Sequence, residues 1–122
     1  MKLIVAIIRP EKLQAVQDAL DALGSSGLTI TDVKGCGTQR GYTESYRGTK
    51  VNISLIPKVE VKVVVADAVV GAVVDAISQA AHTGEIGDGK IFVLPVEDAV
   101  RIRTGERGEE IVRHLQPEHW GH

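Results

Sequence analysis

Apolar residues recur along the first part of the chain in two patterns, one typical of strands and the other of helices. Residues 3–8 form a continuous apolar run, which predicts a strand covered on at least one face. Pro10 then opens a helix, where its fixed φ and missing N–H do no harm, and Gly24 ends that helix as its C-cap. The apolar stripe of the helix has steps of three, four and three residues and consists of Leu13, Val16, Leu20 and Leu23. Residues 28–33 predict a second strand.

A strictly alternating segment follows from residue 58 onward. Val59, Val61 and Val63 point to one side and charged residues to the other, which predicts a half-buried strand. Asp67 is the expected N-cap of a second helix. The apolar face of that helix consists of Val70, Val73, Val74, Ile77 and Ala81.

The last elements are short. A glycine-rich turn over residues 83–89 precedes a strand over 91–94, and another short strand is expected around 100–103. The resulting order is strand, helix, strand, long loop, strand, helix, strand. This order predicts the α+β class and a ferredoxin-like βαββαβ sandwich, in which both helices cover one face of an antiparallel sheet. The other face would be bare and rich in valine, which predicts self-association.

The domain is expected to span residues 1–107, and residues 108–122 form a polar C-terminal tail. Within the domain, glycines and polar residues mark a long loop, about residues 37–56. A loop of that length without regular structure is usually functional in a compact domain.

Composition and charge narrow the function. The formal net charge of -2 gives no basis for nucleic-acid binding, which requires a concentrated basic surface. The single cysteine, Cys36, excludes an internal disulfide and argues against a thiolate metal cluster. The first apolar run is too short for a signal-peptide core or a membrane span, so we expect a cytoplasmic protein.

Residues 83–90 are the segment most suited to binding an anion. Their spacing matches a phosphate-binding P-loop, but Ile91 stands where that loop needs Ser or Thr, and the segment leads from helix to strand instead of strand to helix. We therefore reject the P-loop. Three glycines still allow backbone N–H groups to approach an anion, and Lys90 adds a positive charge. The alternative is an ordinary glycine-rich surface turn.

Two other segments could take part in binding. Arg101 and Arg103 would share one face of the expected short strand and direct two guanidinium groups at one place. Taken alone, however, this segment favours a solvated edge with Glu106 as a neutralising neighbour. The polar residues of the long loop suit a partner surface, as they suit any exposed loop; they include Gln39, Arg40, Glu44, Tyr46 and Arg47. Cys36 has no base near it in the sequence, so no catalytic residue is assigned and we expect no enzymatic activity.

Three motifs together resemble the P-II nitrogen-regulatory signal-transduction family, and the resemblance extends from residue 1 to about residue 107. Residues 41–48 (GYTESYRG) are similar to the T-loop of that family, residues 83–93 (TGEIGDGKIFV) to its B-loop, and residues 100–106 (VRIRTGE) to its C-terminal signature. The resemblance implies a homotrimer with nucleotides bound between neighbouring subunits.

The resemblance also implies specific ligands. ATP or ADP, and also AMP, would be the nucleotide effectors, with Mg²⁺ accompanying ATP and 2-oxoglutarate. Gln39 would ligate this magnesium, and Lys58 would pair with a carboxylate of 2-oxoglutarate. The complete implied 2-oxoglutarate set is Gln39, Gly41, Lys58 and Gly87. The implied nucleotide set is Thr29, Gly35, Gly37, Thr38, Val64, Gly87, Asp88, Gly89, Lys90, Arg101 and Arg103, with the two arginines reaching across from the adjacent subunit.

For partners, the resemblance implies regulation of nitrogen assimilation through the T-loop. Tyr46, Arg47 and Gly48 would dock on a target such as an ammonium transporter or a nitrogen-metabolism enzyme, and a transporter would recruit the protein to the inner face of the membrane. Val51 stands where many family members carry a covalently modified tyrosine, so modification at that position is impossible, and Thr49 stands where some carry a phosphorylated serine.

Three further departures change charge near the implied nucleotide. Thr38 and Glu85 replace basic residues, and Lys62 replaces an acidic one. Loss of positive charge beside phosphates penalises ATP more than ADP or AMP, so we expect a weakened preference for ATP. The alternatives are a divergent paralogue that senses ADP or AMP and regulates another transporter, for example one for bicarbonate; a weak ATPase; and a purely structural trimer.

Overall fold

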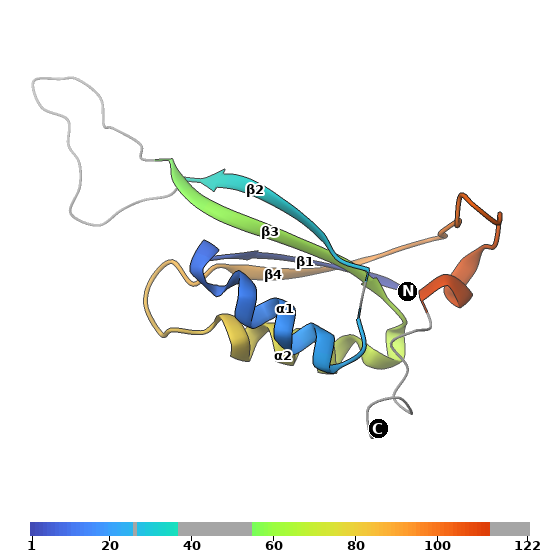
Figure 1. Cartoon of the computed structure of the whole chain (residues 1–122), viewed down its shortest axis with the longest axis horizontal. Coiled ribbons are helices and arrows are strands. Elements are labelled where there is room, and N and C mark those ends of the chain that lie inside the picture. The colour runs from blue at the N-terminus through green and yellow to red at the C-terminus, as the bar shows by residue number, and fades with distance from the viewer. Residues whose placement is uncertain (26, 37–54, 113–122) are drawn as a thin grey trace, which may run out of the picture.

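The computed structural model describes residues 1–25, 27–36 and 55–112, and in this part of the chain a four-stranded antiparallel sheet is covered by two helices on one face (Figure 1). The strand order is β2-β3-β1-β4. This confirms the predicted ferredoxin-like βαββαβ arrangement. The elements are β1 (Lys2–Ile8), α1 (Leu13–Ala22), β2 (Thr29–Gly35), β3 (Ile56–Val65), α2 (Val70–Ala81) and β4 (Lys90–Pro95), with 3₁₀ turns η1 (Pro10–Lys12), η2 (Asp67–Val69) and η3 (Gly108–Val112).

The first helix follows its predicted pattern. Pro10 begins η1, which runs directly into α1, and Gly24 just beyond the helix has a φ of 89°. This left-handed conformation is the one that favours glycine after a helix. In the middle of the stripe Val16 and Leu20 are fully buried, and the two outer leucines pack partly against the core, so the helix docks through the predicted face.

The second helix begins differently from the prediction. Ala66 precedes η2, and no side chain caps the start of either η2 or α2. The Asp67 carboxylate instead lies 3.0 Å from the Met1 ammonium group and 3.3 Å from Lys2 Nζ. The predicted N-cap is therefore wrong, because the start of β1 brings two positive charges to this carboxylate. Their hydrogen bonds, first that of the N-terminus, lower the pKa of Asp67.

The core lies between the helices and the inner face of the sheet. Val59, Val61 and Val63 are at most 3% exposed and belong to one core cluster with buried residues of α1 and α2. The predicted valine-rich bare face is therefore partly wrong, since the alternating valines are covered. Among the described residues no helix covers the opposite face (Figure 1). Its apolar residues come mainly from β1 and β4, where Val5 pairs with Phe92 and Leu3 with Leu94.

The segment after β4 also departs from the prediction. Val100 forms a single bridge with Arg107, and residues 102–104 form a turn, so the short strand expected around 100–103 is absent. Residues 108–112, at the start of the expected tail, form η3, whose Val112 is buried. Residues 113–122 lie outside the described residues. In the described part of the chain, no helix is long and apolar enough to cross a membrane.

Candidate functional site

The glycine-rich loop at residues 83–89 is closed on itself by the carboxylate of Asp88. Oδ2 accepts hydrogen bonds from the backbone N–H groups of Thr83 and Gly84, both at 2.8 Å. Oδ1 accepts from the hydroxyl group of Thr83 and from Arg9 Nε, the latter at 3.0 Å. The Thr83 bonds, with help from Gly84 and Arg9, hold the pKa of Asp88 far below its usual range. The charged Asp88 carboxylate therefore bridges the two ends of the loop by hydrogen bonds.

Close backbone packing explains why the end of this loop needs glycine. Gly89 has a φ of 100°, and a Cβ built on it would lie 1.8 Å from the carbonyl oxygen of Ile7. Gly87 also has a positive φ, 105°, and a Cβ there would come within 3.3 Å of Arg9 Nη2. The loop thus lies directly against the end of β1, which places it at one end of the sheet (Figure 1).

A cleft of about 300 Å³ opens beside the loop on the face that the helices leave free. Two ammonium groups line it, those of Lys58 from β3 and Lys90 from β4. Lys58 Nζ donates a hydrogen bond of 2.6 Å to the carbonyl oxygen of Gly87. The cleft is lined by Ile7, Gly35, Cys36, Ile56, Lys58, Ile86, Gly87, Gly89, Lys90 and Phe92. The structure therefore brings together five sequence-predicted binding residues: Gly35, Lys58, Gly87, Gly89 and Lys90.

Two residues of the implied nucleotide set, Thr29 and Val64, lie together in a second hollow of about 280 Å³. Leu3, Lys62, Ile111 and Val112 also line it, with Gly27 and Val63. Thr29 and Gly35 are six residues apart on β2, so the two hollows are about 20 Å apart along the strand direction. The Lys62 ammonium group lies 3.3 Å from the Glu60 carboxylate, which partly balances its charge.

The two arginines of the C-terminal signature are placed elsewhere. Arg101 Nη1 lies 2.6 Å from Glu106 Oε1, the neutralising neighbour considered as an alternative. The expectation that Arg101 and Arg103 share a strand face is wrong, because Arg103 lies in a turn. This segment is at the opposite end of the sheet from the loop (Figure 1). Within one chain the arginines and the loop therefore do not form one site.

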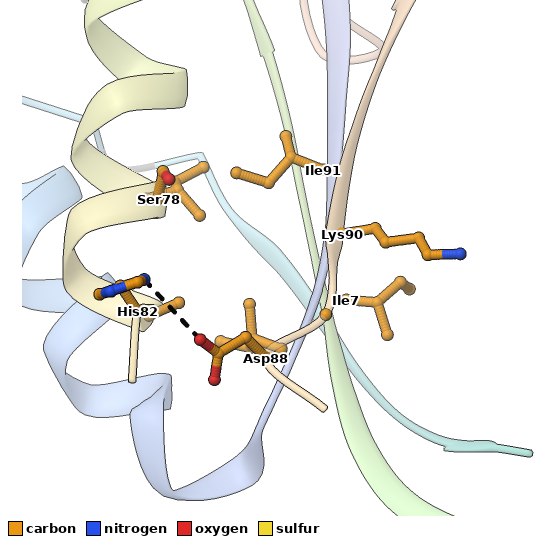
Figure 2. Close-up of a pocket in the computed structure, with 10 residues that line it drawn as sticks. Ile7, Ser78, His82, Asp88, Lys90 and Ile91 are labelled. Carbon is orange, nitrogen blue, oxygen red and sulfur yellow. Dashed lines mark ion pairs between the residues drawn. The ribbon is translucent and has the colours of Figure 1, made fainter. Parts of the chain in front are cut away.

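A third hollow, of about 220 Å³, lies on the helix side of the loop, between the end of α2 and β4. Figure 2 shows the Asp88 side chain directed toward His82 in this hollow, while Lys90 points away on the other side of the strands. His82 Nδ1 lies 3.8 Å from Asp88 Oδ2. The loop therefore has two chemically different sides, a carboxylate side facing α2 and a lysine side facing the open face of the sheet.

Sequence reasoning missed the role of Arg9. Its guanidinium group binds the Asp88 carboxylate and also donates from Nη2 to the carbonyl oxygen of Ile86 at 2.9 Å. The partner carboxylate is 79 residues away in the sequence, so no local spacing could indicate this contact. Thr83 lies in the segment that resembles the B-loop, and no function was predicted for it. Its hydroxyl and N–H groups both donate to Asp88.

Several predicted residues lie outside the described residues, so their positions are not given by the structure. They are Gly37, Thr38, Gln39, Arg40, Gly41, Glu44, Tyr46, Arg47, Gly48, Thr49 and Val51. In the described ranges no group of three or more His, Cys, Asp or Glu side chains could hold a metal ion. The implied magnesium ligand, Gln39, is among the residues not described.

Comparison with known proteins gives consistent matches over nearly the whole chain. The family model described as nitrogen regulatory protein P-II matches residues 1–106. The chain is 54% identical over 112 residues to a nitrogen regulatory protein P-II of Azospirillum brasilense, covering 92% of this chain and all of that protein. It is 55% identical to nitrogen regulatory protein P-II 2 of Methanothermobacter thermautotrophicus, covering 92% and 97%. It is 50% identical over 109 residues to GlnK of Escherichia coli K12, covering 89% and 97%.

Proposed function

This chain belongs to the P-II family of nitrogen regulatory proteins, and from that premise we propose that it senses an adenine nucleotide together with 2-oxoglutarate. Nitrogen-regulatory signal transduction is the function that the family shares. The proposal adds the ligands and the part of the molecule that binds them. The bound nucleotide would be ATP, ADP or AMP, and ATP would bind with Mg²⁺ and 2-oxoglutarate.

The observation that carries the proposal is the pair of lysines beside the glycine-rich loop. Lys58 and Lys90 reach the same cleft from β3 and β4, next to backbone that contains Gly87 and Gly89. The two ammonium groups can pair with the negative charges of a polyphosphate or a dicarboxylate. Backbone N–H groups next to glycine can also approach the oxygens of such an anion closely. Of the two, the ammonium group of Lys90 has no ion pair or hydrogen bond with the described residues, so none of these residues competes with a ligand for its charge.

The position of Lys58 suits 2-oxoglutarate as the second ligand. Its Nζ atom is hydrogen-bonded to one carbonyl oxygen, that of Gly87, and a carboxylate could replace this neutral acceptor with a stronger, charge-assisted bond. Gln39 would add the magnesium contact from the T-loop. The nucleotide would extend along β2, with its adenine near Thr29 and Val64 and its phosphates near the loop.

We further propose that the functional unit is a homotrimer. The open sheet face carries exposed apolar side chains on β4, with Phe92 50% and Leu94 42% exposed, and such a face is stabilised by contact with another copy. Assembly would also let Arg101 and Arg103 of one subunit approach the loop of the next, which they cannot do within one chain. The T-loop residues Tyr46, Arg47 and Gly48 would then contact a target such as an ammonium transporter at the cytoplasmic face of the membrane.

An ATPase is the less favoured function. Asp88, the carboxylate nearest the glycines, faces α2 and is occupied by Thr83, Gly84 and Arg9. It is therefore poorly placed to act as a base in the lysine-lined cleft. We propose that any phosphate release is too slow to serve as the function.

Calorimetric titration of ATP, ADP and AMP, each with and without Mg²⁺ and 2-oxoglutarate, tests the proposal. We expect nucleotide binding, and 2-oxoglutarate binding that requires Mg²⁺ and ATP. We also expect ATP to exceed ADP in affinity by less than tenfold, because Glu85 adds a negative charge to the loop. Lys90→Gln should weaken all three nucleotides, whereas Lys34→Gln, at an exposed position outside the lining of the cleft, should not.

Three results would contradict parts of this proposal. A complete lack of nucleotide binding would leave only a structural role. Nucleotide binding that is indifferent to 2-oxoglutarate would favour the paralogue that senses ADP or AMP. Measured phosphate release at a rate comparable to that of metabolic enzymes would favour the ATPase.

A further inference from the structure

Arg9 connects β1 to the glycine-rich loop without lining the ligand cleft. It is the residue after the last of β1, and its side chain is only 22% exposed. Its guanidinium group uses two separate nitrogens on two separate acceptors, Nε on Asp88 Oδ1 at 3.0 Å and Nη2 on the carbonyl oxygen of Ile86 at 2.9 Å. Neither Arg9 nor Asp88 lines the cleft that contains Lys58 and Lys90.

These contacts determine the direction of two successive peptide groups. In a planar trans peptide the N–H group points opposite to the preceding carbonyl group. Arg9 holds the carbonyl oxygen of Ile86 and thereby sets the N–H of Gly87, while Lys58 holds the carbonyl oxygen of Gly87 at 2.6 Å and sets the N–H of Asp88. Gly87 and Gly89 have no side chain that limits rotation of the backbone. The hydrogen bonds from Arg9 and Lys58 therefore limit this rotation instead.

We propose that Arg9 is a positioning residue of the ligand cleft. It acts through Asp88 and Ile86 to fix the loop N–H groups, and it makes no contact with the ligand itself. The identity of the affected ligand, an adenine nucleotide, rests on the proposed function, but the effect on the loop does not.

The chemistry of the contact requires arginine. A planar guanidinium group can donate in two directions from one fixed plane, and here one donor meets a carboxylate and another a carbonyl oxygen. A lysine has a single ammonium group at the end of a flexible chain, so it can retain the pairing with Asp88 without also holding Ile86. Arg9→Lys therefore keeps the positive charge beside Asp88 but loses the second hydrogen bond to Ile86. Arg9→Gln removes both the charge and the two-directional contact.

Amide hydrogen exchange of the ligand-free protein tests the effect on the loop. In Arg9→Gln we expect the amides of Thr83 and Gly84 to exchange at least about tenfold faster, because their acceptor, Asp88, loses its anchor on β1. Arg9→Lys should give an intermediate rate. Lys12→Gln, a charge loss on the adjacent turn, is the control and should leave both amides unchanged. Unchanged exchange in Arg9→Gln, with the melting temperature confirming a folded protein, would overturn the proposal.

A double-mutant cycle with Asp88→Asn tests whether Arg9 acts indirectly. Arg9→Gln alone should weaken ATP binding about tenfold, because the loop N–H groups lose the two hydrogen bonds that fix their direction. In the Asp88→Asn background the same change should have a clearly smaller effect, since both substitutions break one connection. Fully additive effects would mean that Arg9 does not act through Asp88 and would overturn the proposal. Glu85→Gln, which removes a carboxylate from the same loop, should show no coupling to Arg9.

The two tests separate this inference from the proposed function. If the wild-type protein binds no nucleotide, the proposed function fails, and the exchange measurement still decides whether Arg9 positions the loop. If nucleotide binds but the exchange rates do not respond to Arg9→Gln, the positioning role fails and the proposed function stands.

Discussion

At the scale of single residues, backbone conformation and close backbone contacts explain why the loop needs glycine. Gly89 and Gly84 both have positive φ, but their surroundings differ. A Cβ at Gly89 would lie 1.8 Å from a backbone oxygen of β1, whereas a Cβ at Gly84 would have only the His82 side chain near it, at 3.8 Å. The same substitution at the two positions therefore isolates the cost of the clash from the cost of the backbone conformation.

We expect Gly84→Ala to lower the free energy of unfolding by about 1–3 kcal/mol, the cost of a non-glycine residue at such a φ. Gly89→Ala should cost about 1–3 kcal/mol more, because the added methyl group forces the loop off β1. Urea denaturation of the two variants measures the difference. Equal losses would show that the loop can move away from Ile7 without penalty.

The Asp88 carboxylate should make stability depend on pH. Its folded-state pKa lies below the ordinary value, so it adds stability above about pH 4. That contribution is lost progressively as the pH falls through the ordinary value toward the folded-state pKa. Between pH 5 and pH 2, Asp88→Asn should therefore lose less stability than the wild type in urea denaturation. If the free energy of unfolding depended on pH in the same way for both proteins, the bridging carboxylate of Asp88 would not stabilise the loop.

Sequence reasoning reached part of this site. The glycines and Lys90 were identified because glycine backbone next to a lysine is suited to bind an anion. Asp88 was predicted to line the phosphates, which stays a prediction; its side chain faces α2 (Figure 2), so its backbone N–H is the group left for that contact. The contact with Arg9 could not be predicted, since a pairing across 79 residues depends on how β1 and the loop meet in the fold.

At the scale of elements, periodicity predicted the helices and the central strands well. The apolar stripe of a helix depends only on the spacing of nearby residues. The stripes of α1 and α2 are therefore visible in the sequence itself. The predicted cap at Asp67 was wrong because the carboxylate pairs with the N-terminus, which is far away in the sequence. The strand predicted around 100–103 was wrong because the chain turns back on itself there, and Val100 forms a single bridge with Arg107.

The docking of α1 gives a test at this scale. Leu20 is fully buried, and we expect Leu20→Ala to lower the free energy of unfolding by about 2–5 kcal/mol through lost burial and the remaining cavity. Gln14→Ala on the same helix removes only the exposed hydrogen bond to Asp18 and should cost about 0.5 kcal/mol or less. Chemical denaturation compares them. Similar losses would indicate that α1 is not held by its apolar stripe.

At the scale of the whole molecule, the open face of the sheet is the main unexplained surface. The sequence predicted a bare face but assigned it the wrong residues, because alternation alone does not show which side of β3 the helices cover. The structure places the alternating valines inside and leaves an apolar strip on β1 and β4 outside, beside the charged residues of β3.

If this strip is the contact between copies, a charge in its middle should prevent assembly. Leu94 is 42% exposed, pairs with Leu3 and does not line any of the three hollows described above. We expect Leu94→Asp to convert a trimer into a folded monomer, measured by light scattering after size exclusion. Gln79→Asp, which places the same charge at an exposed position on α2, should leave the trimer intact.

The same variant links assembly to ligand binding. The segment after β4 that carries Arg101 and Arg103 lies at the end of the sheet opposite to the loop (Figure 1), so only a neighbouring copy could bring them to the proposed phosphate site. Monomeric Leu94→Asp should therefore bind ATP at least about tenfold more weakly, as expected when charged hydrogen bonds to the ligand are lost. Its Thr83 and Gly84 amides should keep their protection, because Arg9 and Asp88 act within one chain. A monomer that binds ATP as tightly as the wild type would mean that a single chain forms the complete site.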